Sequence, residues 1–473
     1  MSKEKGTSLH IKNLEGNGNI VMALDSDAVE NKNVKTEMLY IDNIADNSKH
    51  NIILADAKNV LDLEEGQKLR FATIKGKNKQ NIDFGVSEVT GMGIRNVAFN
   101  VEHDTYDENA KDNENYNGES GKGHETELKP GNDFVNENYG NNSGDIGENY
   151  YITKVTKEEV VNPEKEPDNE ISKTIVSMAK GNYNSLVYMD NLNKRLGDIR
   201  FADGDEGIWV RTRNDRVGED NVYRLHNYMT QVGYDKKYAI KNGNEHRGIA
   251  FEYSQGSMEY KEFDGESNID KYLVSLYNTR IYNNGLYTDF LLKGGRADSD
   301  FDIYAETNAT GELSKVKVNG EYKNLFLGAN AEIGKKFNIN ENWYFEPQTQ
   351  LQYTFIDSTD YTTNQNTKVN LEEIHSLIGR AGFRLGHDYS NSTIYIKADA
   401  NHEFMGDQKV EAKDITGRLE KTYYNDNTWF DIGVGGSKDI TPDFNVYMDI
   451  EKQFGTDKDN KSWQFNVGFR YEF

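Results

Sequence analysis

The chain has 473 residues, of which 28% are charged and 36% hydrophobic, and it contains no cysteine. The missing cysteines exclude disulfide scaffolds, cysteine zinc sites and thiol catalysis, and no apolar run approaches the roughly 18 residues of a membrane helix. A net charge of −24 argues against a nucleic-acid binder, which would normally show a basic face. The 29 tyrosines and 21 phenylalanines are nevertheless many for so polar a chain.

Residues 8–103 contain short β-type runs that are separated by Asn, Asp and Gly, such as 18–24, 38–41 and 51–54. Such a series is typical of β-solenoid rungs, in which a stable end rung templates its neighbour and folding propagates along one dimension. We therefore predict a short β-helix or β-solenoid stem over 1–103. A small independent β domain is the alternative.

The next segment, 104–168, is predicted to be a largely disordered insertion and linker. Residues 104–150 hold twelve acidic and three basic residues, with many Asn and Gly, and such a composition cannot bury enough surface to order itself. A returning strand is expected at 150–155. The carboxylates could bind calcium, but no EF-hand spacing is present, so a solvated acidic loop is the favoured interpretation.

Residues 169–200 carry apolar side chains at helical spacing among Asn, Lys, Ser and Thr. These are Ile171, Ile175, Met178, Leu186, Met189, Leu192 and Leu196. The pattern predicts a helix of about 20–30 residues that is weakened at Gly181. This helix could pack outside a domain or thread the lumen of a barrel, which twelve strands would make wide enough. The pattern alone leaves both options open.

From residue 201 to the C-terminus, apolar and polar side chains alternate. In the last segment every odd position from Trp463 to Phe473 is apolar or aromatic, and every even position is polar or Gly. A barrel strand shows only alternate residues to lipid, so such segments can cross a membrane despite a mean hydropathy of −0.84. Twelve strands are predicted, at 207–216, 221–236, 245–256, 269–281, 285–300, 318–334, 341–356, 374–388, 391–404, 426–438, 442–454 and 461–473.

The connections between these strands alternate in length, as in an outer-membrane barrel with short periplasmic turns and longer outer loops. The long loops are expected at 257–268, 301–317, 357–373 and 405–425. The first hairpins break the pattern, with a short link near 217–220 and a longer one near 237–244. Aromatic belts at the membrane interfaces would explain the Tyr and Phe content. A soluble β-sandwich or solenoid is the alternative, because its strands also alternate.

Several motifs follow one another in the order of a known family. The run Asp190–Arg200 (DNLNKRLGDIR) precedes Gly207–Arg211 (GIWVR). Further matches lie at 232–237, 346–348, 377–382 and 469–473. Over 186–473 the chain resembles the translocator domains of type Va autotransporters, and most nearly those of the serine-protease autotransporters of enteric bacteria.

The resemblance implies an all-β fold, a 12-stranded antiparallel transmembrane β-barrel over 201–473 with the helix 169–200 in its lumen. Such a barrel inserts in the outer membrane and brings its own N-terminal passenger to the cell surface. Its partners would be outer-membrane lipid, periplasmic chaperones and the barrel-assembly machinery, which would recognise the terminal Phe473, and the chain would be a monomer. Residues 1–103 would be the passenger end, with an autochaperone-like role.

Three acidic residues stand out within the predicted barrel. Strand alternation places Asp289, Glu332 and Glu346 on the inward face of three consecutive strands, where converging carboxylates repel one another. In the resembling proteases an acidic cluster at the matching positions promotes cleavage of the linker helix, where an Asn side chain attacks its own backbone carbonyl. This chain has Asp190 followed by Asn191 where that family has two Asn residues. Asp lacks the attacking nitrogen, although Asn191 could act one residue later.

A purely structural role is the favoured alternative for these carboxylates. Pairing with Lys194, Arg195, Arg380 or Arg384 would hold the helix as a plug. The passenger would then remain tethered, which suits an adhesin better than a released toxin.

No other chemistry is visible in the sequence. There is no HExxH motif, Gly118–Gly123 has the wrong spacing for a Walker A loop, and the nine histidines form no ligand spacing. We therefore predict no metal, no cofactor and no enzyme activity beyond the doubtful self-cleavage. The start Met1-Ser2-Lys3-Glu4 carries no secretion signal, so a fragment of a longer precursor is expected.

The predicted function is that of an autotransporter translocator that keeps its passenger tethered as an adhesin-like surface protein. The passenger's ligand is not specified by the sequence. The alternatives are an outer-membrane porin or barrel enzyme with an extracellular β module, and a soluble secreted β-protein.

Overall fold

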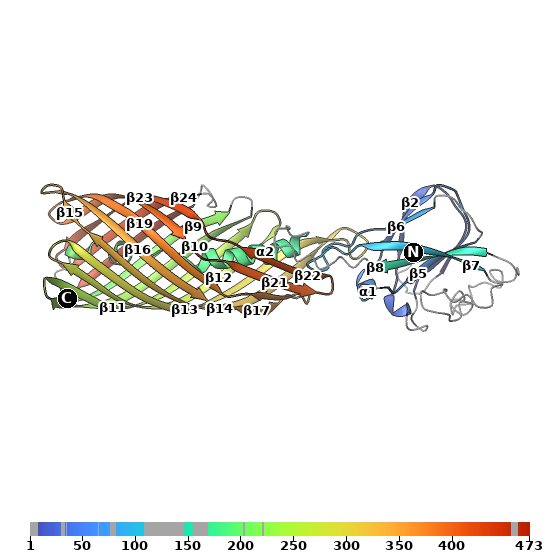
Figure 1. Ribbon diagram of the computed structural model, residues 1–473, viewed down its shortest axis with the longest axis horizontal. Helices are drawn as coiled ribbons and strands as arrows, with labels where there is room; N and C mark the ends of the chain where they lie inside the picture. The colour runs from blue at the N-terminus through green and yellow to red at the C-terminus, as the bar shows by residue number, and fades with distance from the viewer. Residues whose placement is uncertain are drawn as a thin grey trace.

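The computed structural model describes residues 8–29, 34, 36–64, 66–75, 82–107, 146–154, 169–201, 204–219, 222–455 and 462–473. They form two β-rich units along one long axis, a stem near the N-terminus and a barrel that contains the C-terminus (Figure 1).

The stem is a β-solenoid of three rungs, and each rung contributes one strand to each of two parallel arrays. One array contains β1 (Ser8–Leu14), β3 (Met38–Ile44) and β5 (Leu69–Lys75), and the other contains β2 (Asn17–Met22), β4 (Lys49–Leu54) and β6 (Asp83–Val86). Like residues stack between rungs, with Ile11 beside Ile41 and Ile20 beside Ile52. A short 3-10 helix (Ser26–Val29) and α1 (Lys58–Leu61) connect strands. The predicted solenoid stem is confirmed.

An antiparallel hairpin closes one array of the stem. Its strands are β7 (Phe99–Asp107) and β8 (Ile146–Lys154), and β8 also pairs antiparallel with β5. The returning strand expected at 150–155 therefore belongs to the stem and begins earlier than expected. The prediction of disorder from residue 104 onward is wrong for 104–107 and 146–149, which belong to β7 and β8. The rest of the predicted insertion and linker, 108–145 and 155–168, lies outside the described residues, so the predictions of disorder and calcium binding there stay predictions.

The linker consists of two helices rather than one. The first, α2 (Glu170–Leu186), begins at a capping box between Asn169 and Ser172, and the second, α3 (Leu192–Leu196), is followed by a 3-10 turn at Ile199–Phe201. Gly181, the expected weak point, lies within α2, where its lack of a side chain makes room for Met258, and the helix does not break there. The break occurs at 187–191 instead.

The barrel closes as predicted, with twelve long antiparallel strands in a ring in which the last strand pairs with the first. The strands are β9 (Glu206–Glu219), β10 (Tyr223–Ile240), β11 (Gly243–Tyr260), β12 (Asp264–Tyr282), β13 (Leu286–Thr307), β14 (Ser314–Lys335), β16 (Trp343–Ile356), β19 (Ile374–Asp388), β20 (Ser392–Glu403), β23 (Thr428–Thr441), β24 (Phe444–Gly455) and β25 (Trp463–Glu472). A two-residue strand, β15 (Phe337–Asn338), pairs with β16 at one rim.

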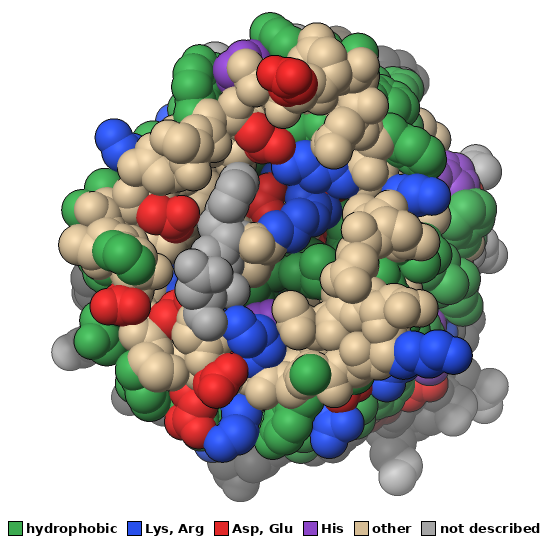
Figure 2. Space-filling view, turned by 90° about the vertical axis from the view of Figure 1, so that its left-hand side faces the viewer, with side chains coloured by type: hydrophobic (Ala, Val, Ile, Leu, Met, Phe, Trp, Pro, Cys, Tyr) green, Lys and Arg blue, Asp and Glu red, His purple; other side chains and the backbone are tan. Residues whose placement is uncertain are grey.

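The two faces of the barrel wall differ in chemistry. Outward side chains are large and apolar, such as Phe251, Leu292 and Leu327, whereas inward ones are polar or charged, such as Arg211 and Glu332. Seen from the end that carries the C-terminus, basic and acidic side chains gather inside the ring and hydrophobic ones lie on its perimeter (Figure 2). No helix among the described residues is both long and apolar enough to span a membrane.

Several connections differ from the predicted ones because the strands are longer than their most apolar parts. The turn between β10 and β11 has only two residues, and Asn242 adopts a φ of 67°, so the longer link expected at 237–244 is wrong. Likewise, β13 and β14 extend to Thr307 and from Ser314, so most of the loop expected at 301–317 is strand. The loop expected at 257–268 is shortened in the same way, to three residues between β11 and β12.

The other two long loops form a second small sheet above the barrel. Its strands are β17 (Thr359–Thr362), β18 (Lys368–Leu371), β21 (Gln408–Asp414) and β22 (Gly417–Tyr423). This sheet lies at the end of the barrel that faces the stem (Figure 1), and its apolar residues Val369, Val410 and Leu419 pack in one cluster with α2.

Inward aromatic rings fill the space above glycines of the neighbouring strand. Trp209 covers Gly233, Tyr277 covers Gly248 and Tyr447 covers Gly468, and a Cβ on any of these glycines would collide with the ring. The glycines thus let bulky rings lie flat against the wall, between the barrel and the linker.

Candidate functional site: the linker in the barrel lumen

The helix α2 lies inside the barrel and the small sheet above it, so the lumen placement is the correct one of the two options. Buried side chains occur all around the helix, including polar ones such as Ser172, Thr174 and Ser177. The wall bonds to it directly, because the Tyr183 hydroxyl donates to Glu403 Oε2 at 2.6 Å and Lys271 Nζ donates to the carbonyl of Ser185 at 2.8 Å. A helix packed outside a domain would keep one face in water.

Between the two helices the chain runs extended across the lumen, and Asp190 lies in this stretch. Both Nη atoms of Arg211 donate to its carboxylate, at 2.9 and 2.6 Å, and Arg211 is itself held by Gln231. The backbone carbonyl of Asp190 accepts from Gln350 Nε2 at 2.6 Å and from Asn330 Nδ2 at 3.2 Å. Asp190 is therefore fixed through both its side chain and its carbonyl.

Asn191 serves as the N-cap of α3. Its side-chain oxygen accepts from the backbone N–H of Lys194 at 2.9 Å, and its carbonyl accepts from the N–H of Arg195 at 3.1 Å. An Asn at this position satisfies an N–H group that the helix leaves without a partner. The local sequence Asp190-Asn191-Leu192 thus ends the extended stretch and starts a helix.

Two of the three predicted carboxylates accept hydrogen bonds from residues of α3. Asp289 on β13 and Glu332 on β14 are register partners. Asp289 Oδ1 accepts from Arg195 Nη2 at 2.6 Å, and Glu332 accepts from the backbone N–H of Leu192 at 3.0 Å. Arg380 Nη2 lies 3.1 Å from the other oxygen of Glu332.

The third carboxylate, Glu346 on β16, contacts the end of the linker. It accepts from Arg200 Nη2 at 2.5 Å and from Arg384 at 2.7 Å. The expected pairing of carboxylates with Arg195, Arg380 and Arg384 is therefore present. Lys194 pairs with Glu451 instead, at 2.8 Å.

Sequence reasoning missed several residues that hold the linker, among them Arg200, Arg211 and Glu451. Arg211 occupies an inward position of its strand, two residues after the buried Trp209, so alternation alone could have found it. A buried charge needs a partner, and this rule would have directed attention to Asp190. The partner of Lys194 could not have been chosen in this way, since several inward acids compete for it.

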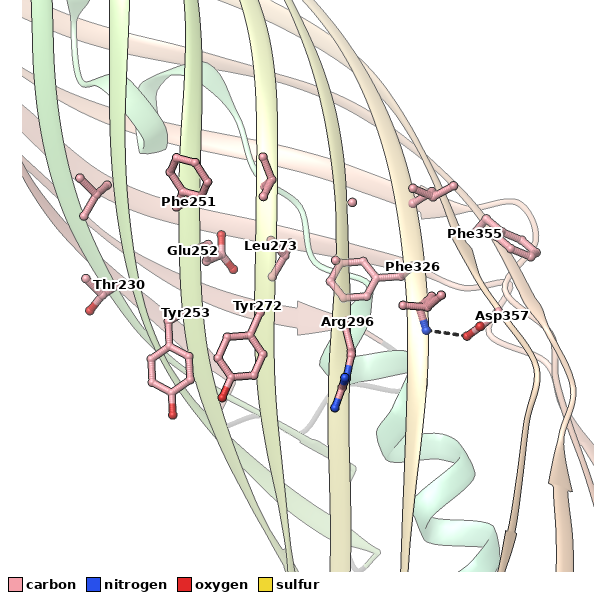
Figure 3. A pocket seen from close by; sticks show the side chains of 16 residues that line it. Thr230, Phe251, Glu252, Tyr253, Tyr272, Leu273, Arg296, Phe326, Phe355 and Asp357 are labelled. Atoms are coloured by element: carbon pink, nitrogen blue, oxygen red, sulfur yellow. Dashed lines mark hydrogen bonds between the residues drawn. The ribbon is translucent and has the colours of Figure 1, made fainter.

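One hollow in the described part of the lipid-facing wall lacks a comparable set of groups. This hollow of about 1000 Å³ lies over strands β10 to β16, and Phe251, Tyr272 and Phe355 are among the residues that line it (Figure 3). Gly294 and Gly295 line it as well. Asp357 accepts from the backbone N–H of Leu325 at 2.6 Å. Neither Ser nor His is among the lining residues, so a lipase-type set is absent from this hollow.

The family model described as "Autotransporter beta-domain" matches residues 206–451, which is just over half of the chain. This chain belongs to the autotransporter β-domain family. The barrel is thus an outer-membrane translocator domain rather than an enzyme, and the porin, barrel-enzyme and soluble β-protein alternatives are set aside.

Individual relatives agree with this assignment. The "Probable autotransporter YcgV" of Escherichia coli (strain K12) is 27% identical over 323 residues, which are 63% of this chain and 32% of the relative. The "Pertactin autotransporter" of Bordetella bronchiseptica is 28% identical over 291 residues, 60% of this chain and 30% of the relative. The "Serine protease EatA" of Escherichia coli O78:H11 is 25% identical over 315 residues, 65% of this chain and 22% of the relative. The chain spans about a third or less of the length of these relatives.

Among solved structures, the transport unit of the autotransporter AIDA-I from Escherichia coli aligns with a TM-score of 0.47 and 17% identity, over 64% of this chain and 98% of that one. The β domain of the Bordetella autotransporter BrkA aligns with a TM-score of 0.44 and 19% identity, over 57% of this chain and 100% of that one.

Proposed function

We propose that this translocator carries its passenger across the outer membrane, exposes the stem at the cell surface and keeps it covalently attached through the linker. The observation that supports attachment is the bidentate ion pair between Asp190 and Arg211 in the lumen. A passenger that stays attached suits an adhesin-like surface protein.

Release by cyclisation would need a nitrogen at the position of the Asp190 carboxylate. In that reaction the side-chain nitrogen attacks the residue's own carbonyl carbon, the peptide bond to the next residue breaks, and a new amine leaves. Asp190 supplies an oxygen in place of the nitrogen, and this oxygen is bound by Arg211. Moving the carboxylate toward its carbonyl would leave the guanidinium of Arg211, which is 1% exposed, without its partner.

Cleavage one residue later meets a different obstacle. The Asn191 side chain caps α3, and its carbonyl accepts a bond from the first turn of the helix. Attack by its amide nitrogen would break this cap, which typically stabilises a helix by about 1 kcal/mol, and would have to unwind the turn as well. The surroundings therefore oppose cleavage both of the peptide bond between Asp190 and Asn191 and of the one between Asn191 and Leu192.

The carboxylates Asp289, Glu332 and Glu346 serve, in this proposal, as anchors for the linker. Each accepts a hydrogen bond from a different linker residue, Arg195, Leu192 and Arg200 respectively. Buried, hydrogen-bonded charges of this kind fix one arrangement of the chain, because every alternative leaves a charge without a partner.

Assembly in the membrane is proposed to use the terminal residue. The backbone of Phe473 exchanges hydrogen bonds with Glu206 of β9, at 3.0 and 3.1 Å, and its ring is 56% exposed on the outside of the ring of strands. The strand β25 thus closes the barrel, and Phe473, directly after it, presents an exposed aromatic ring. Recognition by the barrel-assembly machinery requires such an accessible side chain. Periplasmic chaperones would hold the unfolded strands before this step.

Protease digestion of intact cells tests the surface position of the stem. A protease that cannot cross the outer membrane should remove the stem and leave a protected fragment that contains β9 to β25. Digestion of the stem only after the membrane has been permeabilised would overturn the proposal.

A further inference from the structure

A loop of the stem lies directly against the outer end of the barrel. This seat loop, residues 88–97, is closed at its base by paired backbone hydrogen bonds between Val89 and Val97, both 2.8 Å. Its partners are the β13–β14 connection at 306–309 and the tip of the β21–β22 hairpin at 414–418, which together we name the collar.

The first half of the seat loop bonds to the β13–β14 connection. Asn308 accepts from the N–H of Thr90 at 2.9 Å and donates to the carbonyl of Glu88 at 2.8 Å. The Thr307 hydroxyl donates to the carbonyl of Thr90 at 2.8 Å. A single barrel side chain, that of Asn308, thus forms hydrogen bonds with two backbone groups of the stem.

The second half bonds to the tip of the hairpin. Asp414 accepts from the N–H of Ile94 at 2.9 Å, and Thr416 Oγ1 accepts from the N–H of Arg95 at 3.0 Å. The guanidinium of Arg95 donates to the carbonyl of Arg418 at 3.1 Å. The side chain of Ile94 is fully buried in the cluster that α2 forms with the small sheet.

The fit is close enough to exclude side chains at two glycines. A Cβ on Gly93 would lie 2.5 Å from Asp414 Oδ2, and a Cβ on Gly91 would collide with the carbonyl of Glu306. Gly91 also has a φ of +71°, which side-chain-bearing residues rarely adopt, whereas Gly93 is required by space alone. By contrast, Gly18 in the stem has nothing within 4 Å of its Cβ position.

We propose that the collar is a docking site for the passenger's own base, which fixes the stem upright on the barrel once transport is complete. The seat loop and the collar residues that it contacts lie more than 200 residues apart in the chain. The lumen beneath the collar is filled by α2. The contacts can therefore form only when the stem is outside the barrel. Docking then holds the passenger along the barrel axis (Figure 1). This inference rests on the proposed function in one respect, the surface position of the stem.

The experiment measures the distance between stem and barrel in the full chain. Because the chain has no cysteine, nitroxide labels can be placed at K49C and K317C alone, two lysines that are well exposed on the stem and on β14. Pulsed electron paramagnetic resonance should give one narrow distribution of the distance between the two nitroxide labels. Gly93→Val should broaden it at least about twofold as the joint opens, and the matched Gly18→Val should leave it unchanged.

A distribution that is already broad in the parent chain, or one that stays narrow in Gly93→Val, would overturn the docking joint. Should Gly93→Val fail to assemble, Asn308→Ala removes two of the bonds without adding bulk and is expected to broaden the distribution in the same way. Labelling of K49C on intact cells with a thiol reagent that cannot cross the membrane reports separately on the proposed function. Absence of labelling would refute surface exposure, whereas labelling with a broad distance distribution would refute docking alone.

Discussion

The ion pair between Arg195 and Asp289 gives the sharpest estimate of how firmly the linker is held. Both side chains are fully buried, and their single bond is 2.6 Å long. Removing one member of a buried pair typically costs about 3–5 kcal/mol. The Arg195 Nε and Nη1 atoms have no hydrogen-bond partner, while Asp289 retains a bond from the Thr279 hydroxyl. We therefore expect Arg195→Met to cost about 3 kcal/mol, the lower end of that range.

Hydrogen exchange in detergent, followed by mass spectrometry, measures this cost locally. Since about 1.4 kcal/mol corresponds to a factor of ten, amides of 187–201 should exchange about a hundredfold faster in Arg195→Met. The double variant Arg195→Met, Asp289→Leu removes both charges and should recover most of the protection. Lys315→Met, which breaks a pair with Asp264 in which both side chains are exposed, serves as the control and should change exchange less than about fivefold. An effect of Arg195→Met no larger than this control would refute the anchoring role.

Two further variants test the wall and its assembly. Gly468→Val forces the Tyr447 ring away from the wall and weakens its 2.5 Å bond to the carbonyl of Arg195. Overpacking of this kind costs about 1–3 kcal/mol, so the temperature at which the barrel unfolds on a gel should fall, and an unchanged temperature would argue against the packing. Deleting Phe473 should reduce the fraction of chains that become heat-modifiable in the outer membrane, because the strand end that closes on Glu206 is lost. Equal assembly of the deletion variant would count against recognition of this residue.

Much of the barrel was predictable because period-two alternation follows directly from a wall with lipid on one side and polar groups on the other. All twelve strands were expected, and the bounds of β19 agree with the prediction, whereas β11, β12, β13 and β14 are longer than predicted. The strand β13 runs for 22 residues, about twice the 9–11 that crossing a membrane needs. In its outer half the pattern is reversed, because Phe301, Ile303 and Ala305 face inward and are buried, whereas in the membrane-spanning half the apolar residues face outward. The strands β17, β18, β21 and β22 of the small sheet, which are four to seven residues long, also escaped prediction.

Prediction of the site succeeded where alternation fixes a side chain and failed where the chain changes direction. The inward positions of Asp289, Glu332 and Glu346 followed from the strand pattern. The extended stretch at 187–191 did not, because the apolar residues Leu186, Met189 and Leu192 continue at helical spacing through it. Tertiary contacts decide that break, since Arg211 and Gln350 bind the side chain and the carbonyl of Asp190. Such contacts come from strands far away in the sequence.

The central claim, that the passenger is carried out and stays attached, is tested most directly by the mass of the heated protein from outer membranes. The chain is expressed behind an export signal, and its Asp190→Asn variant, which restores the Asn-Asn pair of the resembling proteases, is run beside it. We expect the parent chain to keep stem and barrel in one polypeptide, and the variant to yield a barrel fragment that begins at Asn191. A fragment beginning at Asn191 or Leu192 in the parent chain would contradict covalent tethering, and an uncut variant would show that the missing nitrogen is not what prevents cleavage.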